Sequence, residues 1–323
     1  MTKVKYITVP QSIDGLDGIF GGWLVRMPCP EAPDKEFVVL VDVGTAAAAP
    51  DFLSALQKEG IGHIDLILLS HIHVDHAGAL AEVLEAYPTA KAICHEKGLR
   101  HLVNPERLWE STKEVMTDLA EMYGKPKPVP ADKLFGFGPE ELAFLPPEVL
   151  DFDFPPIGVM SVQGHAPHSM FFSVGGYYFI GEAACCTFEH NDRVYLRTAT
   201  PPRFEMPVFI NSIDKLLSLP QRPAFAGHSA QAYPSSWLLS RSREQLQRWY
   251  DLLRPYAWPN KEEAEEAYLK RLLNVILKGD PDVGPVGVWC TEKWDSFYHE
   301  NSILGFIDYI RREEQAAEKV RNK

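Results

Sequence analysis

The sequence predicts a layered α/β fold, because short segments of strand character alternate with helical segments along the first ninety-odd residues. The two most apolar segments, 36–43 (EFVVLVDV) and 64–70 (IDLILLS), are short enough to be buried strands. A helix is expected after each of them, at 50–58 and at 77–86. A chain of 323 residues can also bury a large core without disulfide bonds or a structural metal.

The remaining elements of the main domain continue this pattern. Further strands are expected at 5–9, 22–27, 91–94, 158–162, 170–174, 177–180 and 222–226, with a helix at 204–219. Gly175-Gly176 lies between two of these strands and marks a hairpin turn.

The end of the chain differs from the main domain, because its pattern is helical and predicts no strands. These helices are expected at 236–253, 261–278 and 301–318. Five of the seven tryptophans lie in this region, so it must pack against something. We therefore predict a main domain over 1–235 and a C-terminal helical subdomain over 236–323.

The segment at about 98–153 predicts an insertion in the main domain. Its first half has helical periodicity over 106–123, and its second half is rich in proline and aromatic residues. The apolar positions of the expected helix are Leu108, Val115, Met116, Leu119 and Met122. Two interpretations stay open, a lid that shapes a substrate pocket or a peripheral helix packed on the core.

Composition and charge limit the function classes. The chain has 44 acidic and 32 basic residues, a net charge of −12, which opposes binding to a nucleic-acid backbone. No apolar run approaches the ~20 residues of a membrane helix, and residues 1–10 lack the apolar stretch of a signal peptide. The five cysteines are irregularly spaced, which favours a reducing compartment. We expect a cytoplasmic enzyme or binding protein with a small-molecule substrate and no nucleic-acid or membrane partner; a homodimer is left open.

A cluster of metal-ligand residue types follows the apolar segment that ends at residue 70. It reads HIHVDH and places His71, His73, Asp75 and His76 within six residues. Imidazole suits zinc, iron and manganese, and a carboxylate adds an oxygen ligand. If the segment bends, His71 and His73 can reach one metal while Asp75 and His76 turn toward a second. The alternative, a solvated polar loop, fits an isolated histidine better than this cluster.

This cluster resembles the HxHxDH motif of the metallo-β-lactamase-fold hydrolases, in particular their lactonase and glyoxalase-II-like branch. Four further segments over about 1–230 resemble the family in the same order: FVVLVDVG, GHAPHS, FIGEAA and FAGH. The resemblance implies a four-layer αβ/βα sandwich, here with a helical insertion and C-terminal helices.

The resemblance also implies a role for one residue in each of these segments. Asp42 would support the metal ligands without binding the metal itself. His165 would bind the first metal, His228 would bind the second, and Glu182 stands at the metal-bridging position. His168, close to His165, is a candidate for a supporting or substrate contact.

One departure from the family concerns Glu182, because the family usually has Asp there. Glu is longer by one C–C bond, roughly 1.5 Å, in a site whose two metals lie ~3.5–4 Å apart. Four outcomes stay open: the backbone retreats and keeps the bridge, the second metal binds weakly, the metal preference differs, or Glu182 is solvated. Cys185 or Cys186 could replace a displaced carboxylate, although two small buried residues are the simpler interpretation. Tyr233 could donate a hydrogen bond to an oxyanion or simply pack.

The implied ligands would hold two zinc ions, with iron or manganese as alternatives. Such ions lower the pKa of a bound water from 15.7 to about 7, and Asp75 would orient that water or accept its proton. The expected reaction is hydrolysis of an ester, thioester or lactone. The alternatives are a di-iron redox protein of the same fold, whose members usually carry Glu where His73 stands, and a metal-binding protein with impaired catalysis.

Overall fold

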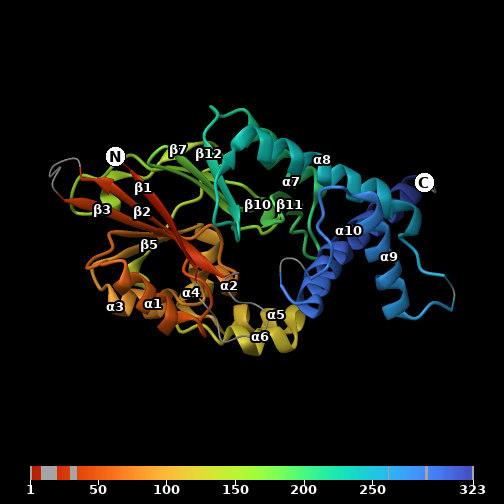
Figure 1. Cartoon of the computed structure of the whole chain (residues 1–323), viewed down its shortest axis with the longest axis horizontal. Coiled ribbons are helices and arrows are strands. Elements are labelled where there is room, and N and C mark those ends of the chain that lie inside the picture. The colour runs from red at the N-terminus through yellow and green to blue at the C-terminus, as the bar shows by residue number, and fades with distance from the viewer. Residues whose placement is uncertain (1, 9–19, 30–34, 261, 288–289, 322–323) are drawn as a thin grey trace.

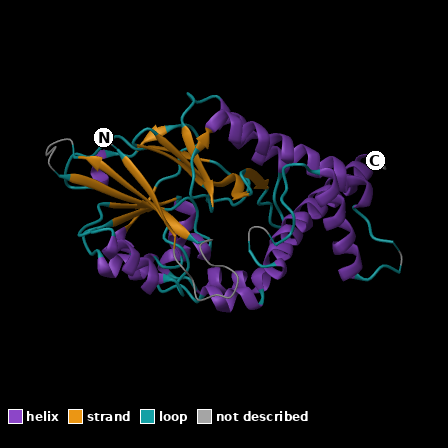
Figure 2. Ribbon diagram, viewed as in Figure 1, coloured by secondary structure: helices purple, strands orange, loops and turns teal. Residues whose placement is uncertain are grey.

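A computed structural model shows two β-sheets packed face to face, with helices on both outer faces (Figure 2). It describes residues 2–8, 20–29, 35–260, 262–287 and 290–321. Residue 9 of the first expected strand and residue 261 of an expected helix lie outside this part. The layered α/β fold predicted from the sequence is confirmed, as is the four-layer sandwich.

The first sheet has six strands whose spatial order follows their order in the chain. The strands are β1 (Lys3–Thr8), β2 (Gly21–Pro28), β3 (Glu36–Val41), β4 (Leu66–Leu68), β5 (Lys91–Cys94) and β6 (Leu134–Gly136). The first three pair antiparallel, and the pairs from β3 to β6 are parallel. Helices α1 (Ala49–Lys58) and α3 (Leu80–Ala86) connect the parallel strands and cover the outer face.

The second sheet has the order β13-β12-β10-β9-β8-β7, with β11 paired to β10. Its strands are β7 (Ala143–Phe144), β8 (Gly158–Ser161), β9 (Met170–Val174), β10 (Tyr177–His190), β11 (Arg193–Arg197), β12 (Pro223–Gly227) and β13 (Tyr233–Pro234). Strand β10 is longer than the expected 177–180 and pairs with β11, which the sequence analysis did not expect. The small residues AACC that continue β10 carry no alternating pattern, which explains the difference.

The apolar run in β3 is buried on both faces of its sheet. Val39 and Val41 face the second sheet, where they join the core around Trp23 and Phe172. The alternate residue Leu40 faces α1 and α3 instead. Because successive side chains of a strand point to opposite faces, a strand covered on both sides must be apolar throughout.

The C-terminal helices share one core with the outer face of the second sheet. They are α8 (Ser235–Leu253), α9 (Glu265–Gly279) and α10 (Glu292–Arg321), and helix α7 (Met206–Leu217) of the main domain packs into the same core. The buried carboxylate of Asp280 ties α8 to the end of α9, since it accepts hydrogen bonds from Trp249 Nε1 at 2.7 Å and Gln245 Nε2 at 2.8 Å. The division at residue 235 stays a prediction, and the structure adds that apolar packing continues across it.

The segment at 98–153 is divided between helices and sheet edges. It forms α4 (Leu99–Val103), α5 (Glu106–Met116) and α6 (Asp118–Tyr123), and then contributes β6 and β7. The expected single helix over 106–123 is therefore wrong, because Thr117 adopts a positive φ of 48° and breaks it. The long α10 reaches back to α5 and α6 (Figure 1), and Tyr298 of α10 packs with Tyr123 of α6.

Short helices complete the described chain. They are α2 (Val74–Ala77) and the 3₁₀ turns η1 (Glu96–Gly98), η2 (Ala131–Lys133), η3 (Pro147–Val149) and η4 (Arg254–Tyr256). Across the part of the chain that the structure describes, no helix is long and apolar enough to cross a membrane.

Strand β2 lies very close to the turn after β3 at Gly22, and a substitution there tests this contact. A Cβ there would lie 2.1 Å from the carbonyl oxygen of Asp42, a backbone atom that cannot rotate away. We predict that Gly22→Ala lowers the free energy of unfolding by about 2–3 kcal/mol, measured by chemical denaturation. Gly62→Ala is the matched control, since no atom lies within 4 Å of its Cβ position. Equal stability of the two variants would contradict this packing.

Candidate metal centre

The HIHVDH segment changes direction between its second and third polar residues. Strand β4 ends at Leu68, and His73 has an extended conformation with φ −60° and ψ 152°. The carbonyl of His73 then accepts hydrogen bonds from the N–H groups of His76 and Ala77, which starts the short helix α2. This turn separates His71 and His73 from Asp75 and His76.

Three segments of the second sheet bring the remaining candidates to the same place. His165 lies in the connection between β8 and β9, Glu182 lies within β10, and His228 directly follows β12. Strands β10 and β12 are parallel neighbours, so Glu182 and His228 come from the same region of the second sheet. The site is therefore built where the two sheets meet.

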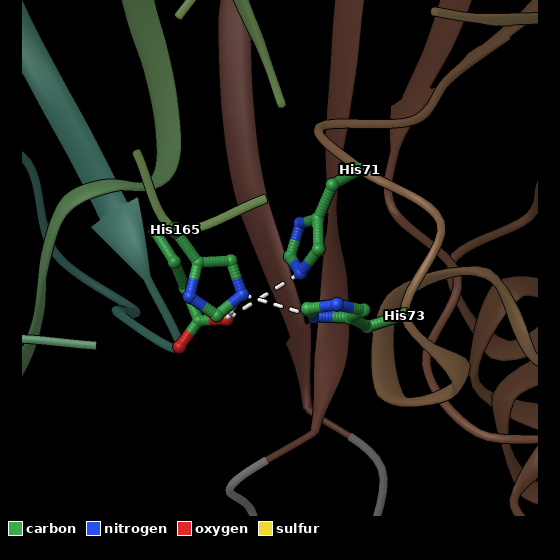
Figure 3. Close-up of side chains that lie close together, drawn as sticks. His71, His73 and His165 are labelled. Carbon is green, nitrogen blue, oxygen red and sulfur yellow. Dashed lines mark hydrogen bonds and ion pairs between the residues drawn. The ribbon is translucent and has the colours of Figure 1, made fainter. Parts of the chain in front are cut away.

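The candidate ligands form two groups of donor atoms, each within 4.8 Å of one another. The first group is His71, His73, His165 and Glu182; the second is Asp75, His76, His228 and Glu182. In the first group, the imidazoles of His71, His73 and His165 point toward one another (Figure 3). In the second, Asp75 Oδ2 lies 3.6 Å from Nε2 of both His76 and His228.

Glu182 belongs to both groups and lies between them. Its Oε2 atom is 3.0 Å from His165 Nε2 and 3.6 Å from His76 Nε2. Its Oε1 atom is 3.7 Å from His228 Nε2. The side chain is 8% exposed, so the solvated interpretation of Glu182 is wrong.

The backbone around Glu182 makes room for the longer side chain. The register between β10 and β12 shifts on both sides of Gly181, which has a positive φ of 58°. On the facing strand, a Cβ at Gly227 would lie 2.5 Å from Cγ of Glu182. A residue larger than glycine at position 227 would therefore occupy the space filled by the methylene that Glu182 has in addition to those of an aspartate.

Hydrogen bonds outside the site orient three of the imidazoles. His76 Nδ1 lies 2.8 Å from the buried Asp42 carboxylate, which also accepts from the backbone N–H and hydroxyl of Ser70. His165 Nδ1 donates to the carbonyl of Ala199 at 2.9 Å, and His71 Nδ1 lies 3.1 Å from the Ser70 hydroxyl oxygen. Each contact directs the Nε2 atom of the ring into the site.

The chemistry of the donor set fits divalent metal ions. Nε2 atoms of His71 and His76 are buried and have no hydrogen-bond partner. A buried nitrogen without a partner costs roughly 1–3 kcal/mol, which a metal ion would offset. Imidazole nitrogens with carboxylate oxygens suit zinc, iron and manganese. The residues present would therefore hold such an ion in each group, with Glu182 shared.

Burial and mutual charge set the protonation of the cluster. Burial lowers the pKa of His71 well below its ordinary value and that of His73 to about 4. Burial also opposes the charge on Glu182, but the imidazole of His165 and its neighbours outweigh it and hold the pKa of Glu182 well below its usual range. Glu182 is thus ionised at neutral pH and available to a cation.

A cavity of about 400 Å³ opens beside the two donor groups. His73, Asp75, His165, Glu182 and His228 reach its floor. Its outer walls include residues of α4, α5, α6 and α10, so the segment at 98–153 lines the cavity, which favours the lid interpretation.

Several residues of this cavity were not predicted from the sequence. Tyr123 and Tyr298 line it and contact one another through their hydroxyl groups. Arg197 also lines it, and its guanidinium lies 5.0 Å from the Tyr298 ring centre. Tyr123 ends a helical pattern and could have been noticed. Tyr298 and Arg197 had no local signal, because their place depends on how α10 and β11 pack.

The remaining candidates lie near the cavity or away from it. His168 lines it, accepts from the N–H of Ile72 at 3.4 Å, and has its pKa lowered to about 2 by burial and the charge of His73. Cys186 donates its thiol hydrogen to Glu182 Oε1 at 2.8 Å. Among the described residues, neither Cys185 nor Cys186 joins a donor group. The oxyanion interpretation of Tyr233 is wrong, because its hydroxyl donates to Glu189 outside the cavity.

A two-sheet sandwich with paired histidine–carboxylate groups at its strand ends defines a metallo-β-lactamase fold. The sequence profile of the metallo-beta-lactamase superfamily matches residues 23–228, which is more than half of the chain. The chain therefore belongs to this superfamily, in agreement with the resemblance seen in its motifs.

Individual relatives agree with this assignment. The metallo-beta-lactamase fold-containing protein ST1585 of Sulfurisphaera tokodaii is 28% identical over 205 residues, 62% of this chain and 71% of that protein. The probable metallo-hydrolase MJ0888 of Methanocaldococcus jannaschii is 32% identical over 74 residues, 23% of this chain and 35% of that protein.

Solved structures show the same fold at lower identity. The crystal structure of ST1585 superimposes with a TM-score of 0.60 at 20% identity, covering 86% of this chain and 96% of that one. The family protein TTHA1429 from Thermus thermophilus gives a TM-score of 0.61 at 18% identity, covering 96% of this chain and 94% of that one.

Asp42 provides a test of the outer hydrogen bonds. We predict that Asp42→Asn weakens zinc binding roughly 10–100-fold, because His76 loses the carboxylate that orients it. The affinity is measured by competition with a chromophoric chelator. Asp65→Asn is the matched control, since Asp65 accepts a backbone N–H from Val38 at the opposite end of the β3–β4 pair. Equal zinc affinity of the two variants, with both folded by circular dichroism, would contradict this role.

Proposed function

We propose that the protein is a metal-dependent hydrolase of esters, thioesters or lactones, with zinc as the metal. The observation that carries the proposal is that two donor groups share the Glu182 carboxylate and open onto one substrate-sized cavity. The apolar part of the cavity wall, from Ile72, Val74, Leu108 and Met116, favours an acyl group. A cytoplasmic location and the absence of nucleic-acid and membrane partners remain part of the proposal.

Metal ions bound in these groups would supply Lewis acidity and lower the pKa of water to about 7. The chain's own residues would then handle the substrate and its protons. Asp75 is 16% exposed, lines the cavity and offers a carboxylate oxygen that can accept a proton. Glu182, held ionised by its neighbours, would keep the imidazoles around it in place.

Two phenols in the cavity wall support acyl transfer. Burial raises the pKa of Tyr123 and of Tyr298 well above the ordinary value, so both hydroxyl groups stay protonated at neutral pH. A protonated phenol in a buried wall can donate a hydrogen bond to the oxygen of a reacting carbonyl. Tyr298 comes from α10, outside the part of the chain that matches the family.

The alternatives differ in measurable ways. A di-iron redox protein would contain iron and consume oxygen, and a protein with impaired catalysis would bind ester and lactone ligands without turnover. His73 stands where redox relatives usually carry Glu, which favours the hydrolase. Metal analysis together with an ester, thioester, lactone and phosphodiester panel separates these classes.

His73 tests the hydrolase directly. We predict that His73→Ala lowers metal-dependent ester hydrolysis by at least about 100-fold, because it removes a donor of the first group. The same loss should follow removal of metal by a chelator and be reversed by added zinc. His63→Ala is the matched control, because His63 is exposed in the loop before β4 and belongs to neither donor group. Unchanged turnover in His73→Ala would overturn the mechanism.

A further inference from the structure

The cavity is basic in a chain that is acidic overall. Among the described residues its lining includes Arg100, Arg107 and Arg197, whereas its only carboxylates are the candidate ligands Asp75 and Glu182. The whole chain carries a net charge of −12. The outer wall of the cavity therefore has the opposite sign to the protein as a whole.

The two arginines at the edge are available to a ligand. Arg100 lies in the first turn of α4 and Arg107 in the first turn of α5, and both side chains are exposed. Within the part of the chain that the structure describes, neither guanidinium is in an ion pair. Arg100 Nε donates to His101 Nε2 at 3.1 Å, which positions that guanidinium beside the cavity. A pair of guanidinium groups without carboxylate partners favours an anion.

Helix α5 turns an apolar stripe toward the same cavity. Leu108, Thr112, Val115 and Met116 follow at helical spacing and all line it. Val115 remains 44% exposed, so its apolar surface is not covered by the protein core. The stripe begins next to Arg107. The apolar chain of a ligand that lies along this stripe would therefore end close to the two arginines.

From this arrangement we infer that the substrate has an apolar acyl segment ending in an anionic group, which Arg100 and Arg107 bind while the acyl segment lies along α5. The inference rests on the proposed hydrolase and names its substrate class. Binding of a long polyanion is disfavoured by the net charge of −12 on the whole chain. The anion is a terminal carboxylate or a terminal phosphate, since guanidinium groups pair with both.

Binding of matched ligands tests this without turnover. Isothermal calorimetry compares butanoate, hexanoate and octanoate with the dicarboxylates succinate, adipate and suberate on the zinc-loaded protein. The second carboxylate is the only difference within each pair. At the best chain length we expect roughly tenfold tighter binding of the dicarboxylate, or about 1.4 kcal/mol. A phosphonate-terminated acid of the same length distinguishes phosphate from carboxylate recognition.

Variants of the arginines locate the effect. In the double variant Arg100→Gln, Arg107→Gln, the tenfold ratio of the affinity for the dicarboxylate to the affinity for the monocarboxylate should fall to about one. Lys113→Gln is the matched control, because it removes a positive charge from α5 outside the cavity lining. The ratio in that variant should equal that of the unmodified protein. Raising the salt concentration should also reduce the ratio.

Hydrolysis of the corresponding 4-nitrophenyl esters provides the second measurement. The adipate monoester should have about tenfold higher kcat/KM than the hexanoate ester, and the double variant should lose this preference. If the protein hydrolyses the esters but shows no preference for the dicarboxylate at any chain length, in binding or in hydrolysis, the inference is overturned. The proposed hydrolase would stand in that case. Preferential dicarboxylate binding that the double variant abolishes, with no ester hydrolysed, would support anion binding by Arg100 and Arg107 and contradict the proposed hydrolase.

Discussion

The convergence of five imidazoles and a second carboxylate on Glu182 is the constraint that shapes the centre of this protein. An isolated buried carboxylate is strongly unfavourable unless cations or hydrogen bonds surround it. Here imidazoles from both sheets surround it, and the Cys186 thiol donates to one of its oxygens. The departure from Asp to Glu is accommodated by a register shift in β10 and by Gly227 on the neighbouring strand. The longer side chain of Glu182 therefore fits because the backbone of β10 is irregular at this position.

The sandwich architecture explains why this convergence is possible. The apolar faces of the two sheets fix their separation, and the polar candidates all lie where strands end or bulge at one edge of the packed layers. Asp42, in a left-handed conformation with φ 60°, reaches from the end of β3 to both Ser70 and His76. The C-terminal helix α10 closes the other side of the cavity through Tyr298. The part of the chain that matches the family thus provides the donor atoms, and α10 beyond it limits which ligands fit the cavity.

Much of this was predictable from local sequence. The β-branched apolar run EFVVLVDV indicated a buried strand. The residue types in HIHVDH indicated a metal site, in which a bend would separate His71 and His73 from Asp75 and His76. Other features depend on contacts distant in sequence. The break at Thr117, the length of β10 and the edge strands β6 and β7 have no periodic signal. Tyr298 enters the cavity only because α10 packs against α6, and Tyr233 leaves it because Glu189 accepts its hydrogen bond.

In the proposed metal centre Glu182 would be shared by two metal ions, and metal content tests this sharing most directly. Zinc is counted per chain by plasma mass spectrometry after equilibrium dialysis, for the unmodified protein and for Glu182→Gln, which keeps the side-chain shape and removes the charge. A shared carboxylate predicts two ions per chain in the first case and weaker binding of both in the second. A single ion per chain, or the same two ions with unchanged affinity in Glu182→Gln, would contradict it.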